Sequence, residues 1–288
     1  MHPAMPANYT VRVMSRADLD LALQWAAAEG WNPGLDDAEA FHATDPGGFL
    51  MGWLGQTPIA SLSVVAYGAH YGFLGLYIVQ PAFRGLGYGW ALWQAGMAQL
   101  GTRAVGLDGV VAQQANYGRS GFVLAHRNIR FQGRATPAPV ASQTPVVVPL
   151  AQVGWRDIVA YDRACFSASR EAFLAVWLRP RAGAAVACVQ AGAVAGYGVI
   201  RPCRQGYKIG PLFADQPSQA EALLQTLLRA VPEGSPVYLD VPETNPDALA
   251  LAQRQAMAPM FETARMYRGN PTLPDMSRTY GITTFELG

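Results

Sequence analysis

Apolar and polar residues along the chain follow two patterns, short apolar runs and amphipathic stretches of helical period. Phe73–Val79 is a run of aromatic and aliphatic residues without a charge, which predicts a buried strand. Pro81 ends this strand because proline has no N–H to donate to a sheet. A helical pattern follows, and its apolar face carries Trp90, Trp93, Met97 and Leu100. A glycine-rich turn therefore joins the end of a strand to the start of a helix.

The same patterns predict an ordered set of elements over residues 10–133. A helix starts at Ser15, which together with Asp18 has the spacing of a helix N-cap. The other expected elements are a strand at Val11–Met14, a short helix at Asp37–His42, a hairpin of Phe49–Leu54 and Ile59–Tyr67, and strands at Ala104–Val111 and Val123–Phe131. We expect Val123–Phe131 to close this first unit.

Beyond Arg134 the pattern begins again. A stretch rich in proline and small residues, ATPAPVASQTPVVVP, is typical of a connector. The expected elements after it are helices at Trp155–Phe166 and Glu171–Leu178, a hairpin of Ala185–Gln190 and Val194–Ile200, a strand at Tyr207–Phe213, a helix at Ser218–Ala230 and a strand at Val237–Val241. Two short texts repeat: Val105–Asp108 matches Val237–Asp240, and Ile129–Gly133 matches Arg265–Gly269. We predict an α+β protein with two mixed, mostly antiparallel sheets flanked by helices, in domains 1–134 and 150–288 joined by a linker at 135–149.

The turn between strand and helix reads Arg84-Gly85-Leu86-Gly87-Tyr88-Gly89. Glycines let the backbone approach a ligand closely, and the free N–H groups of the first helical turn favour an anion such as phosphate. Two familiar phosphate motifs do not fit, because the P-loop lysine is absent and the dinucleotide fingerprint would need glycine where Trp90 or Leu92 stands.

Arg84-x-x-Gly87-x-Gly89 after a strand, in this order of elements, resembles the pyrophosphate loop of the GNAT (general N-acetyltransferase) superfamily. The resemblance implies that acetyl-CoA is the acyl donor and that its diphosphate binds at the loop. It also implies that the preceding strand splays from its neighbour and holds the pantetheine arm. The coenzyme-binding residues so implied are Tyr77, Ile78, Val79, Arg84, Gly85, Leu86, Gly87, Tyr88, Gly89 and Asn116. The texts EGWNPG, GLDG, GYKIGPLFAD and FETARMYRG resemble tandem GNAT proteins with a YitH/HolE-type second domain.

Tyr117 is the leading catalytic candidate. It lies four residues before the glycine of Gly121-Phe122, the spacing of the family's tyrosine beside the thioester sulfur. A phenol with a pKa of roughly 10 can donate a proton to a departing thiolate. Glu29 and Asp108 are candidate bases or amine anchors. Other roles stay open, since Glu29 could be a surface charge at a helix end and Asp108, repeated as Asp240, could be structural.

Composition narrows the class of protein. The 288 residues are 51% hydrophobic and 14% charged with a net charge of +1, which argues against bulk nucleic-acid binding. No apolar run reaches the roughly 18 residues of a membrane span, and no HExxH, GxSxG or CxxC text occurs. Three scattered cysteines favour neither a disulfide framework nor a metal site. We expect a cytoplasmic monomer or homodimer that binds no metal, nucleic acid or membrane.

Together these features predict an N-acyltransferase that transfers an acetyl group from acetyl-CoA to a small-molecule or peptide amine. Direct attack is favoured because the first domain has no cysteine. The alternative is a non-catalytic module that senses acyl-CoA or a metabolite. In the second copy Asp215–Ala220 replaces the glycine loop, so we expect one coenzyme per chain and a second domain that walls the acceptor site. Arg201, Glu262 and Lys208, which is the single lysine, are expected to face the acceptor or the domain interface.

Overall fold

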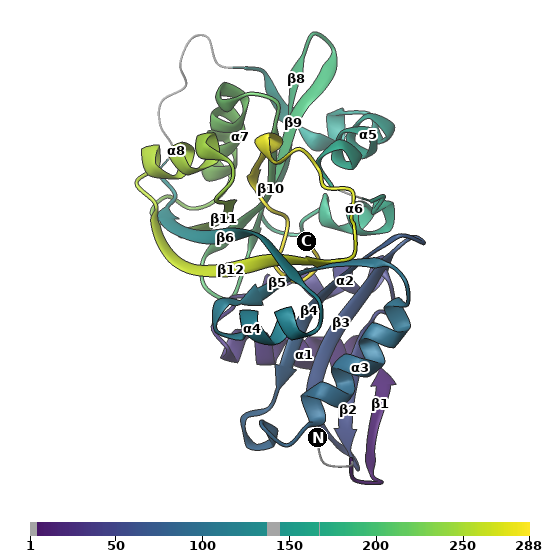
Figure 1. The fold of residues 1–288 in the computed structure, drawn as a ribbon. Coiled ribbons are helices and arrows are strands. Elements are labelled where there is room, and N and C mark those ends of the chain that lie inside the picture. Colours follow the sequence, from purple (N-terminus) through teal and green to yellow (C-terminus); the bar gives the residue numbers. More distant parts are fainter. Residues whose placement is uncertain (1–4, 137–144, 167) are drawn as a thin grey trace.

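The computed structural model describes residues 5–136, 145–166 and 168–288, and in these residues thirteen strands form one sheet (Figure 1). The first half contains β1 (Tyr9–Val13), α1 (Arg16–Ala28), α2 (Asp37–Thr44), β2 (Phe49–Leu54), β3 (Thr57–Tyr67), β4 (Tyr71–Val79), α3 (Tyr88–Leu100), β5 (Ala104–Val110), α4 (Gln114–Arg119) and β6 (Val123–Arg134). The second half contains β7 (Val147–Pro149), α5 (Trp155–Cys165), α6 (Glu171–Trp177), β8 (Ala184–Gln190), β9 (Ala193–Pro202), β10 (Tyr207–Ala214), α7 (Pro217–Arg229), β11 (Pro236–Pro242), α8 (Pro246–Arg254), β12 (Ala258–Arg268) and β13 (Thr279–Gly281).

The α+β class and the tandem order of elements are confirmed, and the ends of the predicted elements differ from the observed ends by at most three residues. Helix α1 begins where expected, since Ser15 and Asp18 form a reciprocal capping box. The last three residues of the expected linker form β7, which pairs with β8. Residues 137–144 of that linker lie outside the described residues. The division at residues 134 and 150 stays a prediction.

The two halves share one sheet because their last strands are exchanged. Strand β12 of the second half lies between β5 and β6, and β6 then pairs with β11. Figure 1 shows β6 and β12 running side by side between the lower, first half and the upper, second half. The prediction that Val123–Phe131 closes the first unit is therefore wrong, since β12 takes the place beside β5. The sheets expected for the two domains are continuous with each other, because β12 pairs with β5 and β6 pairs with β11.

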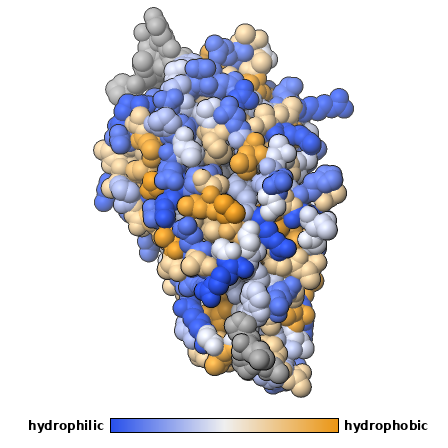
Figure 2. All heavy atoms as spheres, viewed as in Figure 1, coloured by the Kyte–Doolittle hydropathy of each residue, from blue (hydrophilic) through white to orange (hydrophobic). Residues whose placement is uncertain are grey.

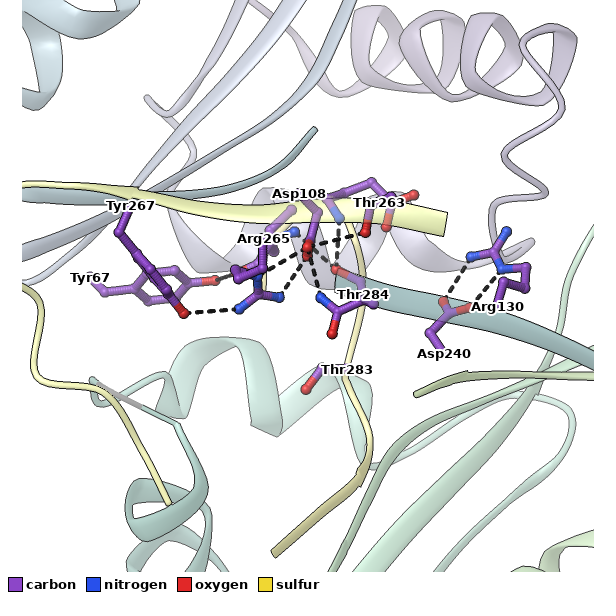
Figure 3. Close-up of polar contacts among 12 residues, drawn as sticks. Tyr67, Asp108, Arg130, Asp240, Thr263, Arg265, Tyr267, Thr283 and Thr284 are labelled. Atoms are coloured by element: carbon purple, nitrogen blue, oxygen red, sulfur yellow. Dashed lines mark hydrogen bonds and ion pairs between the residues drawn. The ribbon is translucent and has the colours of Figure 1, made fainter. Parts of the chain in front are cut away.

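Two buried ion pairs fix this exchange, one on each side (Figure 3). Arg265 on β12 lies opposite Asp108 on β5, with Nη2 2.6 Å from Oδ2. Arg130 on β6 lies opposite Asp240 on β11, with Nε 2.7 Å from Oδ1. Both contacts are bidentate, which fixes register as well as charge. Arg130 and Arg265 therefore occupy equivalent positions in the two halves. The sequence alignment, which matched Ile129 with Arg265, was one residue out of register.

Helices of both halves share one hydrophobic core. Phe41 on α2 stacks on Trp177 of α6 with ring centroids 6.3 Å apart. Arg201 on β9 lies over the Trp177 ring and binds buried Asp37 of α2, with Nε 2.7 Å from Oδ1. Arg201 is therefore an interface residue between the halves. Glu262 on β12 is exposed, and it pairs across the halves with Arg127 on β6. On the outer surface, Figure 2 shows hydrophobic and hydrophilic residues intermixed over the visible face.

We expect one histidine to make the folded state sensitive to acid. Burial, together with nearby Arg265, lowers the pKa of His126 from 6.5 to about 4. Between these values the unfolded chain binds more protons than the folded chain, so stability falls as pH decreases from 6.5 to 4. The loss amounts to about 3 kcal/mol at 1.36 kcal/mol per pH unit. Urea unfolding across this range should show a shallower pH dependence for His126→Gln, and an unchanged slope would exclude His126 as its source.

Candidate active site

A cavity of about 680 Å³ lies where β4 and β5 separate. The two strands pair in parallel only from Tyr71 to Leu74 on β4. Beyond that point β4 bulges at Leu76, a non-glycine residue with φ of 47°, whose carbonyl accepts a hydrogen bond from Ser61. Residues of both strands line the cavity. The expected splay of this strand from its neighbour is confirmed.

The glycine loop forms one end of the cavity. Gly85 and Gly87 have φ of 76° and 89°, which disfavours other residues, and Gly87 is the N-cap of the thirteen-residue helix α3. A Cβ on Gly89 would lie 2.7 Å from the Tyr77 hydroxyl and 2.8 Å from Val79, so this glycine lets α3 pack against β4. The free N–H groups of the first turn of α3 can therefore receive an anion at the cavity wall.

Arg84 and Glu29 lie together beside this loop. The Arg84 Nη2 is 2.5 Å from Glu29 Oε1, and its Nε donates to the Val79 carbonyl at 2.8 Å. Both side chains line the cavity, and Arg84 is about half exposed at 49%. A diphosphate at this loop would compete with Glu29 for the Arg84 guanidinium.

Tyr117 reaches the cavity from α4. Its ring stacks on Trp93 of α3 with centroids 5.7 Å apart. Gly109 on β5 makes room for it, since a Cβ there would lie 2.2 Å from Tyr117 Cε2. Burial raises the pKa of the Tyr117 phenol to about 12, so it keeps its proton at neutral pH. The phenol can therefore act as a hydrogen-bond donor or general acid in the cavity.

Asp108 lines the cavity, but its oxygens already have partners. Besides Arg265, they accept hydrogen bonds from Asn128 Nδ2 at 2.8 Å and Thr263 Oγ1 at 3.3 Å. The Asp108 side chain is fully buried. This set of contacts supports the structural alternative for Asp108 more than its use as a base.

Asp108→Asn separates the two roles. We expect it to lower the free energy of unfolding by about 3–5 kcal/mol, because the buried Arg265 would lose its counter-charge. The control is Asp36→Asn, whose partner Arg181 is 3.6 Å away and exposed, so the change should be small. Urea unfolding measures both. An Asp108→Asn protein with normal stability and no turnover would assign Asp108 to the chemistry instead.

The structure brings most of the sequence-predicted residues to one cavity. The predicted residues on its wall are Glu29, Tyr77, Ile78, Val79, Arg84, Gly85, Gly87, Gly89, Asp108, Asn116 and Tyr117. Leu86 and Tyr88 lie outside the lining, because Leu86 is 51% exposed and Tyr88 packs against Tyr9 and Phe83. Twelve of the other sixteen lining residues are in the first half, and Trp31 is one of them.

Sequence reasoning missed four lining residues that come from the second half: Phe261, Thr263, Phe285 and Glu286. Phe261 and Thr263 lie on β12. Part of the β12 sequence matches a repeat, but nothing in it indicates that this strand joins the strands of the first half. The last two lie in the C-terminal segment after β13, which no pattern assigned to a site. Burial of that segment is a tertiary property, and its short apolar text, ITTFELG, gave no local signal.

The corresponding gap of the second half is filled by the chain itself. Strands β10 and β11 pair in parallel only from Tyr207 to Ile209, and β13 then pairs with β10. The Ile282 N–H donates to the Asp240 carbonyl at 2.9 Å, and a Cβ on Gly210 would lie 2.5 Å from the Thr283 carbonyl oxygen. At the start of α7, Asp215 pairs with Arg278 at 3.1 Å. A pantetheine arm could not enter there without displacing this segment.

The described residues hold no group of three or more His, Cys, Asp or Glu side chains placed to bind a metal ion. None of their helices is long and apolar enough to cross a membrane.

Comparisons with known proteins agree with this geometry. Residues 17–122 match the model of the acetyltransferase (GNAT) family, and residues 158–281 match that of an acetyltransferase (GNAT) domain. Holothin acyltransferase of Pseudoalteromonas sp. (strain SANK 73390) is 30% identical over 284 residues, which span 98% of this chain and 95% of that protein.

Two solved structures share the fold. One is a putative acetyltransferase from Pyrococcus horikoshii, with a TM-score of 0.84 at 20% identity over 100% of this chain and 99% of that one. The other is a tandem GNAT protein from the clavulanic acid biosynthesis pathway, with a TM-score of 0.64 at 15% identity over 92% and 100%. With two matched domains, a full-length relative and a tandem structure of the same fold, the chain belongs to the GNAT acyltransferase family as one of its tandem members.

Proposed function

We propose that this acyltransferase transfers an acetyl group from acetyl-CoA to the amine of a small-molecule or peptide acceptor by direct attack. The observation that carries the proposal is that the glycine loop and Tyr117 line the same cavity, at the point where β4 and β5 separate. The loop and Arg84 would hold the diphosphate, and Tyr77 to Val79, the part of β4 that does not pair with β5, would hold the pantetheine arm. The second half contributes Phe261, Thr263, Phe285 and Glu286 to the same cavity, and the acceptor would bind beside them.

The side chains of this cavity suit a single displacement. The amine nitrogen would form a bond to the thioester carbonyl carbon, the carbon–sulfur bond would break, and the phenol of Tyr117 would donate to the departing sulfur. Tyr117 can do so because burial keeps it protonated. The three cysteines are buried in the second half and none lines the cavity, which favours direct attack over transfer through a cysteine thioester.

The relative's name gives a first acceptor to test. That protein is named for acylating holothin, and it matches this chain over nearly its whole length. We propose holothin, together with a panel of simple amines, as trial acceptors for this chain. The Glu29 carboxylate stays a candidate amine anchor or base.

The proposal is tested by thiol release from acetyl-CoA in the presence of these amines. We expect acceptor-dependent release, and we expect calorimetry with coenzyme A to give one site per chain because the second gap is filled. Tight binding of acyl-CoA without release for any amine would favour the sensor alternative. Two sites per chain would show that the second half binds a coenzyme too.

A further inference from the structure

The C-terminal segment, residues 282–288, packs against β3 and β4 of the first half. The Tyr67 hydroxyl donates to the Leu287 carbonyl at 2.9 Å, and Ser63 Oγ donates to the Glu286 carbonyl at 3.4 Å. A Cβ on Gly75 of β4 would lie 2.2 Å from that same Glu286 oxygen. Glycine at position 75 therefore lets the C-terminal segment lie directly against β4, where this strand separates from β5.

Glu286 is one of the residues that line the cavity, although it is only 3% exposed. Its Oε1 is buried and accepts no hydrogen bond from the described residues. The other two carboxylates of the lining are already engaged, since Asp108 binds Arg265 and Glu29 binds Arg84. A buried carboxylate oxygen without a partner is costly, and a site that binds a cationic amine removes that cost. Glu286 is thus the carboxylate of this cavity with an acceptor oxygen to spare.

Aromatic rings surround the same end of the cavity. Phe261 and Phe285 meet edge to face with centroids 6.0 Å apart, and both line the cavity together with Trp31. Arg130 contacts all three residues. Its guanidinium lies 4.7 Å from the centroid of the Phe285 ring and 6.0 Å from that of Phe261. Its Nη1 donates a hydrogen bond to the Trp31 carbonyl at 2.8 Å. Because Arg130 is itself held by Asp240, these ring positions depend on the strand exchange.

We propose that Trp31, Phe261 and Phe285 form the acceptor subsite and that Glu286 takes the proton from the acceptor's ammonium group. This inference rests on the proposed function. The acceptor class it implies is a small primary amine with a flat, uncharged body, since aromatic walls favour stacking and one carboxylate neutralises one ammonium. The Glu286 backbone lies against β4 and the Tyr117 ring lies against β5, so the two residues flank the gap between these strands.

The positions of Glu286 and Tyr117 account for both protons that the acceptor nitrogen loses. The acceptor enters as an ammonium ion, and Glu286 takes one proton to leave a neutral amine. The nitrogen then forms the amide bond, the carbon–sulfur bond breaks, and the sulfur receives a proton from Tyr117. The second proton lost by the nitrogen restores the Tyr117 phenol, and Glu286 passes its proton to water. No oxidant, reductant or metal is needed.

Charged groups on several elements act on Glu286. Burial raises the pKa of its carboxyl group, and the carboxylate of Asp37 on α2 raises it further. Lys208 on β10 lowers this pKa most, followed by Arg130 on β6 and Arg201 on β9. Activity should therefore rise with pH as Glu286 ionises. Removing the Lys208 charge should move this rise to higher pH.

The test measures kcat/KM as a function of pH, with benzylamine as the acceptor, for the wild type, for Glu286→Gln and for the control Glu262→Gln. Glutamine preserves the shape of the glutamate side chain. Glu262 is exposed and lies outside the cavity lining. We expect Glu286→Gln to lower kcat/KM by about 10²–10⁴-fold and to abolish the rising limb, with coenzyme A affinity unchanged in calorimetry. Glu286→Asp should retain a reduced limb. Lys208→Met should shift the rising limb to higher pH. A purely structural role of Glu286 would not produce this shift.

The acceptor class is tested with the wild-type protein. Benzylamine should have a kcat/KM at least about tenfold above that of 1,5-diaminopentane, and Phe285→Ala should remove most of this difference. Equal use of both amines would overturn the aromatic subsite. An unchanged limb in Glu286→Gln, or its loss in Glu29→Gln instead, would overturn the role of Glu286 while leaving the proposed function standing. A wild-type protein that releases no thiol with any amine, holothin included, would overturn both.

Discussion

Gly87→Val should abolish coenzyme A binding while leaving most of the fold intact. Gly87 has φ of 89° and is the N-cap of α3, so a β-branched residue there is strained and would place its methyl groups where the diphosphate meets the first-turn N–H groups. The strain alone is on the order of 1–3 kcal/mol, which a domain of this size can tolerate. The effect on binding should be complete because the loop acts through its backbone.

Titration calorimetry with coenzyme A measures this effect, and circular dichroism checks the fold. The matched control is Gly101→Val, because Gly101 also has positive φ, at 62°, but lies at the opposite end of α3 and outside the cavity lining. Val at position 101 carries the greater backbone strain, since φ of 62° with ψ of −126° lies outside the left-handed region that Gly87 occupies, so a loss of binding in Gly87→Val alone reports the ligand site. If Gly87→Val binds coenzyme A as the wild type does, the ligand site lies elsewhere and the proposed function fails.

Tyr117→Phe should keep coenzyme affinity and slow turnover by about 10²–10⁴-fold, the usual contribution of general acid catalysis. The phenol is the group lost, since the ring would still fill the space beside Gly109 and stack on Trp93. Because the Tyr117 phenol has a pKa of about 12, the loss should be nearly independent of pH between 6 and 9.

Steady-state thiol release gives kcat, and calorimetry gives the affinity. Tyr207→Phe, on β10 of the second half and outside the cavity lining, controls for loss of a tyrosine hydroxyl in general. Turnover equal to that of the wild type would reduce Tyr117 to a packing residue and leave the departing thiolate without a protein donor.

The amino-acid sequence determined the local structure of this protein and the donor side of its site. Apolar runs and helical periods gave most helices and strands because each pattern reports burial of one face within a few residues. The glycine loop and the Tyr117 spacing were readable for the same reason, since backbone conformation and a short helix are local properties. The resemblance of this order of elements to the GNAT family implied that the loop and Tyr117 meet in one cavity.

The tertiary structure alone decided how the halves share their strands and what forms the acceptor side. Strands β6 and β12 have similar apolar patterns, and which neighbour each one joins depends on partners such as Asp108 and Arg265, which are 157 residues apart. The C-terminal segment likewise has no period that points to burial, yet it fills the second gap and carries Glu286 into the first cavity. Such pairings depend on complementary charge and shape between distant segments, and a local pattern contains neither.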